Sequence, residues 1–127
     1  MEINSGIDLI EVNRLENTYK NYGNRFLTRI YDPKEIEQFN KRSKGAKPNF
    51  LAKNFAAKEA VSKVLGVGFS QGVRPKDIVV LRKYGPPEVE LKGEAKKLAM
   101  RKGIKKISVS LSDTDDLAVA VAQAIIN

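Results

Sequence analysis

The sequence contains no cysteine, no histidine and no tryptophan in its 127 residues. Without cysteine the chain has no disulfide, no thiol nucleophile and no thiolate metal site. Without histidine it has no imidazole base and no histidine-ligated zinc. Any enzymatic proton transfer would therefore use a carboxylate, a lysine, a tyrosine or water, and any metal would be a hard cation held by oxygen ligands.

Long apolar runs are also missing. No stretch approaches the roughly 18 apolar residues of a membrane span, and the first ten residues carry Glu2 and Asp8 where a secretory signal would have a basic start. We therefore expect a cytoplasmic protein. A length of 127 residues, with 42% hydrophobic and 30% charged residues, predicts one globular domain over residues 1–127.

Positive charge dominates, with 23 Lys and Arg against 15 Asp and Glu, a formal net charge of +8. A surplus of this size favours an acidic partner such as nucleic acid, a phosphorylated metabolite or an acidic protein. Most of it lies in residues 20–63, where eleven bases face four acids. The alternative is an ordinary solvated surface; the functional interpretation is a landing surface that speeds association more than it adds affinity.

Helical and strand patterns alternate without a regular βαβ rhythm, which predicts an α+β fold. Strands are expected over residues 3–10, 77–82, 88–91, 107–111 and 117–126, and helices over residues 11–20, 25–30, 33–39, 50–65 and 93–102. Alanine content would also allow a helix over 117–126, but alternating valines favour a strand. Asp32, Pro33 and Glu35 form a helix-start signal. We expect a basic loop at 41–49 and a flexible glycine loop at 66–72.

The first motif that bears chemistry is GIDLIEVNR, which begins at Gly6 and ends at Arg14. Asp8 stands in an apolar run at the end of a predicted strand, where a carboxylate is costly unless it is paired, capping a helix or bound to a metal. Capping of the following helix is the structural alternative.

The second motif, FAAKEAVSK, places Glu59 and Lys63 four residues apart on one helix face. Such a pair is common on helices and worth a few tenths of a kcal/mol. This face, however, is flanked by Phe55, Ala56 and Ala60 and not by other charges, which makes it a better candidate for a site.

Two loops complete the set. Gly66 and Gly68 follow the long predicted helix, and small residues let a phosphate approach the backbone, although most such loops are simple turns. The segment SLSDTDD at 110–116 is a strand followed by a polar turn, most often a hairpin with side-chain hydrogen bonds.

Together the motifs resemble the 4′-phosphopantetheinyl transferases, in particular their short single-domain group, the holo-[acyl-carrier-protein] synthases. The resemblance rests on the GxDxxxxxR start, the FxxKEAxxK helix with its following GxG, and the terminal SxS turn, and it runs from Gly6 to about Val121. It implies a small, mostly antiparallel sheet with helices packed on it, including a long central helix.

The resemblance also implies a reaction. The 4′-phosphopantetheine arm of coenzyme A is transferred to a serine of an acidic acyl carrier protein, a step of fatty acid biosynthesis that releases adenosine 3′,5′-bisphosphate and requires Mg²⁺. It implies a homotrimer with active sites between subunits, and neither nucleic acid nor a membrane as partner. The implied roles are metal binding for Asp8 and Glu59, catalysis for Glu59 and Lys63, coenzyme binding for Lys63, Gly66 and Ser112, and carrier-protein binding for Arg14, Arg25 and Arg29.

The chain departs from the family at two positions. The terminal turn usually reads SxSH, and Asp113 replaces that histidine. Since a carboxylate would repel a phosphate, we expect Asp113 to turn outward or to pair with a base such as Arg74 or Lys76. Asn54 stands where a basic residue is common, so a phosphate contact is expected to be missing there.

Two other functions compete with the transferase. Residues 92–106 carry seven bases against one acid, which is compatible with a basic RNA- or ribosome-binding module, although an aromatic stacking platform is lacking. The other alternative is a carrier-docking protein that has lost catalysis, for which Asp113 is the argument.

Overall fold

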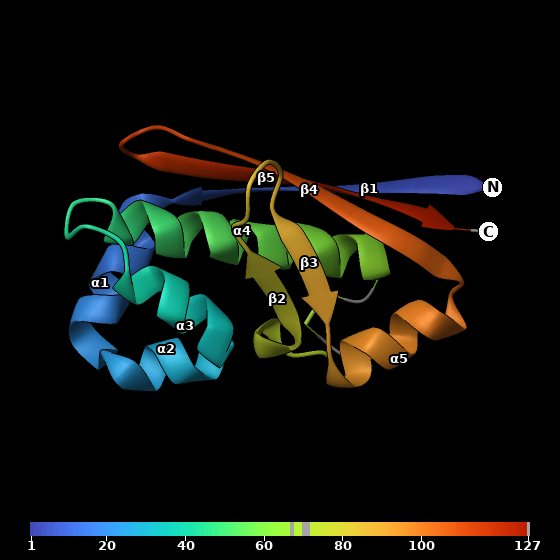
Figure 1. Cartoon of the computed structure of the whole chain (residues 1–127), viewed down its shortest axis with the longest axis horizontal. Coiled ribbons are helices and arrows are strands. Elements are labelled where there is room, and N and C mark those ends of the chain that lie inside the picture. Colours follow the sequence, from blue (N-terminus) through green and yellow to red (C-terminus); the bar gives the residue numbers. More distant parts are fainter. Residues whose placement is uncertain (67, 70–71, 127) are drawn as a thin grey trace.

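The computed structural model describes residues 1–66, 68–69 and 72–126. A three-stranded sheet lies along one side of a long central helix, and the other helices and a two-stranded hairpin lie on the opposite side (Figure 1). The predicted α+β class is confirmed. Both ends of the described chain lie at the same end of the sheet (Figure 1).

The sheet is antiparallel, with β5 (Leu117–Ile126) between β1 (Glu2–Glu11) and β4 (Ile104–Asp113). The strand predicted over 117–126 is confirmed, and its alanines explain how the helix packs. Four successive inward positions of β5 are fully buried alanines, namely Ala118, Ala120, Ala122 and Ala124. Methyl groups allow the central helix to lie close to the sheet.

The central helix α4 (Lys47–Leu65) is buried on nearly every side. It begins earlier than predicted, so the basic loop expected at 41–49 is shorter. Pro48 lies in the first turn, where a missing N–H removes no helical hydrogen bond. The helix ends as predicted at Gly66, whose φ of 86° is left-handed and favours glycine.

Gly6 of β1 lies directly against α4. A Cβ placed on Gly6 would overlap the carbonyl oxygen of Ala60 and would stand 3.2 Å from Lys63 Cβ and from Val64 Cγ2. The glycine of the first motif is therefore a packing requirement, because any side chain would push β1 away from α4.

The remaining helices and the hairpin cover the other side of α4. They are α1 (Val12–Tyr22), α2 (Asn24–Ile30), α3 (Pro33–Asn40), the short helix η1 (Pro75–Asp77), strands β2 (Ile78–Leu81) and β3 (Glu88–Leu91), and α5 (Gly93–Arg101). The capping box predicted for α3 is present, with Asp32 Oδ1 accepting from the Lys34 N–H and Glu35 Oε1 accepting from the Asp32 N–H.

The bounds predicted for one strand need correction, and part of one predicted loop falls on residues that the structure does not describe. β4 is longer than the 107–111 predicted, because exposed polar residues such as Lys105 and Ser112 occupy strand positions on a sheet edge and hide its pattern. Part of the predicted glycine loop, residues 67, 70 and 71, lies outside the described residues.

The outer face of the three-stranded sheet carries large apolar side chains. They are Ile3, Ile7 and Leu9 on β1 and Leu117, Val121 and Ile125 on β5, each between 37% and 63% exposed. Every described helix lies on the opposite face (Figure 1). Among the residues described, no helix is both long and apolar enough to cross a membrane.

Candidate active site

Asp8 and Lys63 meet where β1 crosses α4. The ammonium of Lys63 donates to the carbonyl oxygen of Ile7 at 2.7 Å and lies 3.4 Å from Asp8 Oδ1. Asp8 does not cap the next helix, because β1 continues to Glu11, and Glu11 itself makes no side-chain capping bond. The capping alternative for Asp8 is therefore wrong.

Glu59 lies one turn before Lys63 on α4 and is partly buried. Burial raises the pKa of Glu59, and the negative charge of Asp8 raises it further, while Lys63 and Arg14 lower it. These couplings place Glu59 in one electrostatic neighbourhood with all three residues. Lys63 forms its ion pair with Asp8 and not with Glu59, so an ordinary helix-surface pair is the wrong interpretation.

The two carboxylates fit a magnesium ion. Both are hard oxygen donors, and their mutual repulsion would be relieved by a divalent cation between them. Across the described residues no three metal-ligating side chains cluster together. Mg²⁺ commonly binds one or two protein carboxylates and takes its remaining ligands from water and substrate phosphates.

Arg14 extends the site along α1. Its guanidinium lies over the Phe55 ring, 5.9 Å from the centroid, and its charge acts on Glu59. Arg14, Thr18 and Tyr22 recur every four residues and so share one face of α1. This face leads from Glu59 to a second feature, between α1 and α2.

The second feature is a cavity of about 350 Å³ between α1 and α2. Its lining consists of Thr18, Tyr22, Arg25, Phe26, Arg29 and Ile30. The predicted carrier-binding arginines Arg25 and Arg29 therefore line one hollow, with apolar side chains between them. Arg14 is not part of this lining but stands on the same face of α1, nearer Glu59.

The structure separates Ser112 from the carboxylates within one chain. Ser112 lies on β4 opposite Val119, on the outer face of the sheet, whereas Asp8 lies on β1 and faces α4. Gly66 lies at the end of α4, about one turn beyond Lys63, and Lys102 donates a hydrogen bond to the neighbouring carbonyl of Leu65.

Two cationic cavities on the β4 side of the molecule were not predicted from the sequence. One of about 680 Å³ is lined in part by Lys53, Arg82, Lys83 and Ser110, and another of about 370 Å³ by Arg42, Lys53, Arg82 and Asp113. Burial, with the charge of Arg42, lowers the pKa of Arg82 to about 10, so Arg82 stays protonated at neutral pH. The basic pair Arg82 and Lys83 before a predicted turn is the one signal that could have indicated them.

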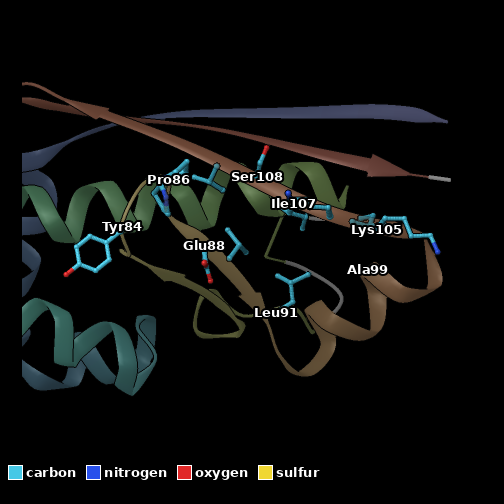
Figure 2. Close-up of a pocket in the computed structure, with 13 residues that line it drawn as sticks. Tyr84, Pro86, Glu88, Leu91, Ala99, Lys105, Ile107 and Ser108 are labelled. Carbon is cyan, nitrogen blue, oxygen red and sulfur yellow. The ribbon is translucent and has the colours of Figure 1, made fainter.

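A fourth cavity, of about 640 Å³, lies between the β2–β3 hairpin and β4. Figure 2 shows Tyr84 at one end and Lys105 at the other, with Leu91 and Ile107 between them. Its lining mixes apolar side chains with polar ones, since Glu88 and Ser108 also lie between the two ends (Figure 2).

Both departures have structural explanations. Asp113 pairs with a base, as expected, but that base is Lys53 and neither Arg74 nor Lys76. Asp113 accepts a hydrogen bond from Asn49 at 2.7 Å and pairs with Lys53 at 3.3 Å, whereas Arg74 pairs with Asp77. Strand β4 ends near the start of α4, so Asp113 meets residues of α4 and not the basic residues at η1.

Asn54 is fully buried, so it is not placed to meet a phosphate. Its amide donates to Glu35 Oε2 and to the carbonyl of Val80, and its oxygen accepts from the Arg82 guanidinium at 2.7 Å and 3.1 Å. The neutral side chain of Asn54 thus holds the charged guanidinium of Arg82 next to it through these hydrogen bonds.

Similarity to known proteins shows which family the chain belongs to. A profile of the 4′-phosphopantetheinyl transferase superfamily matches residues 4–122. The chain therefore belongs to the 4′-phosphopantetheinyl transferase superfamily, a family of enzymes, as the resemblance of its motifs predicted.

Within that superfamily the similar proteins carry one particular name. The chain is 46% identical to a holo-[acyl-carrier-protein] synthase of Caldanaerobacter subterraneus subsp. tengcongensis, over 98% of this chain and 96% of that protein. Among solved structures, the holo-[acyl-carrier-protein] synthase of Neisseria meningitidis matches with a TM-score of 0.84 at 34% identity, covering 95% of this chain and 96% of the other. The Helicobacter pylori synthase, solved in complex with coenzyme A, matches with a TM-score of 0.83 at 29% identity, covering 96% of this chain and 100% of the other.

Proposed function

We propose that this chain is a magnesium-dependent holo-[acyl-carrier-protein] synthase. It transfers the 4′-phosphopantetheine of coenzyme A to a serine of an apo-acyl carrier protein. The observation that carries the proposal is the Asp8–Lys63 ion pair where β1 crosses α4, with Glu59 one turn before Lys63 and within reach of both charges. Superfamily membership and the coenzyme A complex of a related synthase support it.

The serine oxygen of the carrier forms a bond to the phosphorus that bears the pantetheine arm, and the bond from that phosphorus to adenosine 3′,5′-bisphosphate breaks. Asp8 and Glu59 would hold the Mg²⁺ ion, which supplies Lewis acidity to the diphosphate oxygens when bound. Lys63 places a positive charge near the same oxygens. Glu59, whose pKa is raised, accepts the serine proton directly or through a water.

The cavity lined by Arg25 and Arg29 fits an acidic carrier protein. Two guanidinium groups flank the apolar side chains of Phe26 and Ile30, which is the surface that an amphipathic acidic helix requires. Arg14 continues this surface toward Glu59, so a carrier bound there would present its serine to the carboxylates.

A homotrimer with shared active sites accounts for two further observations. The outer face of the sheet presents apolar side chains of β1 and β5 that a partner subunit would cover. The carboxylate Asp8 lies on the β1 edge strand, while Ser112 and the cations Lys53 and Arg82 lie on the β4 side. A coenzyme bound between two subunits would use both halves, with Gly66 and Ser112 in its lining.

The activity is tested by incubating an apo-acyl carrier protein with the chain, coenzyme A and Mg²⁺ and recording the carrier mass. Wild type is expected to add one phosphopantetheine, and Asp8→Ala or Glu59→Ala to lose transfer by orders of magnitude while staying folded. Glu37→Ala removes an exposed carboxylate on α3 and is the matched control. Near-normal turnover of either site variant at saturating Mg²⁺ would show that the metal assignment is wrong. Tight RNA binding without transfer would favour the alternative of a basic RNA-binding module.

A further inference from the structure

Lys58, the residue before Glu59, forms an ion pair in the interior of the protein. Lys58 Nζ lies 2.6 Å from Glu35 Oε1, and both side chains are fully buried. Lys58 also donates to the carbonyl oxygens of Ile78 at 2.6 Å and Pro75 at 3.0 Å, so all three N–H groups of the ammonium are used. One side chain of α4 is thus tied to α3, η1 and β2.

Glu35 extends this network in two directions. Its Oε1 also accepts from the N–H of Asp32 at the start of α3, and its Oε2 accepts from Asn54, one turn before Lys58 on α4. Asn54 in turn accepts two hydrogen bonds from Arg82, which lines the cationic cavities. No side-chain polar atom buried in the described residues lacks a partner. The network therefore fixes two successive turns of α4 on one side.

The opposite side of α4 is fixed by β1. Gly6 leaves no free space against Ala60, and Lys63 donates to the Ile7 carbonyl. Neighbouring residues of a helix point in directions roughly 100° apart. Because Lys58 is held toward α3 and β2, Glu59 is directed toward β1 and Asp8. A small rotation of α4 about its axis would carry Glu59 away from Asp8.

We propose that Glu35 and Lys58 are positioning residues for the metal carboxylates, acting by setting the rotation of α4. This inference rests on the proposed function, in which Asp8 and Glu59 bind the metal. It accounts for a charged pair in a place where apolar residues would give equal or greater stability. It also gives a role to the lysine of the FAAKEA motif, which does not reach the site itself.

The variant that tests the proposal is the double substitution Glu35→Leu and Lys58→Met. Removing both charges leaves no isolated buried charge, so the double variant is expected to fold, as circular dichroism and melting temperature would verify. Glu35→Gln combined with Lys58→Met is the conservative variant, because it also removes both charges and keeps one acceptor oxygen within the network. Lys34→Met removes the ammonium of an exposed Lys34–Glu90 pair and is the matched control.

Two measurements separate positioning from simple stability. The first is the affinity for Mn²⁺, as a probe of the divalent site, followed by electron paramagnetic resonance without carrier protein. The second is the set of steady-state constants against Mg²⁺, coenzyme A and carrier. The double variant is expected to need about ten- to a hundredfold more divalent ion, as for substitutions behind metal ligands. Its turnover should recover at high Mg²⁺, while its KM for the carrier and the Lys34→Met constants stay unchanged.

The proposal is overturned if the folded double variant binds Mn²⁺ and responds to Mg²⁺ as wild type does. If that variant does not fold, Glu35→Gln combined with Lys58→Met decides by the same measurements, with a raised divalent requirement supporting the proposal and wild-type behaviour overturning it. Failure of the proposed function gives a different result, namely no transfer by wild type itself, and the Mn²⁺ measurement then still tests the positioning.

Discussion

Replacing Gly6 by alanine adds one methyl group between β1 and α4, at the point where the two elements bring the candidate metal ligands together. The new Cβ would overlap the Ala60 carbonyl oxygen and stand 3.2 Å from Lys63 Cβ and from Val64 Cγ2. Backbone on one side and a buried valine on the other leave it no room, so β1 must shift. Overpacking of this kind costs about 2 kcal/mol.

At roughly 4 °C for each kcal/mol in a chain of this size, the melting temperature should fall by roughly 8 °C. Asp8 shares β1 with Gly6, so the shift also moves the carboxylate from Glu59, and the Mg²⁺ concentration for half-maximal transfer should rise more than the KM for the carrier. Calorimetry and mass-spectrometric rate assays measure the two effects. Gly45→Ala, where a Cβ meets nothing within 4 Å, controls for the melting temperature. Wild-type stability and Mg²⁺ dependence in Gly6→Ala would refute the close-packing argument.

The remaining predictions concern a charge, a turn and the outer face. Because the pKa of Glu59 is raised in the folded state, its ionised form destabilises the fold at neutral pH. In the absence of divalent ions, Glu59→Gln should therefore raise the melting temperature at neutral pH. This gain should vanish below pH 4.5, the ordinary pKa of a glutamate. A lower melting temperature at neutral pH would contradict this. Asp113→His should leave transfer unchanged or faster, since it frees Lys53 from an internal anion; a loss of roughly tenfold or more would show that Asp113 is needed. Val121→Lys, opposite Ile7 on the outer face, should lower the particle mass measured by light scattering, and an unchanged mass would argue against that interface.

Local signals were enough to predict most of the fold. The capping box at Asp32, the left-handed stop at Gly66 and the alternation over 117–126 depend on neighbours within a few residues. The edge strand β4 was less predictable, because solvent covers its lysines and serines and removes the apolar pattern that marks a strand.

The candidate site was predictable only in part. Asp8, Glu59 and Lys63 were proposed from the motifs, and in the structure Lys63 pairs with Asp8 while the charges of both act on the pKa of Glu59. The partner of Asp113 and the pairing of Arg82 with Asn54 join residues far apart in sequence, and no periodicity encodes them. The same holds for Ser112, whose distance from Asp8 depends on strand order and on which side of the sheet each residue faces.

The buried alanines of β5 make this middle strand a spacer between the sheet and α4. Ala120 stands opposite Asp8 in the register and is fully buried on the side of the sheet that faces α4. The thickness of this layer, and with it the gap between two acidic groups on different elements, is set by side chains that have no chemistry of their own. A larger residue at any of these positions is therefore expected to lower activity by changing this gap. A screen for inactivating substitutions should find these alanines as well as Asp8 and Glu59.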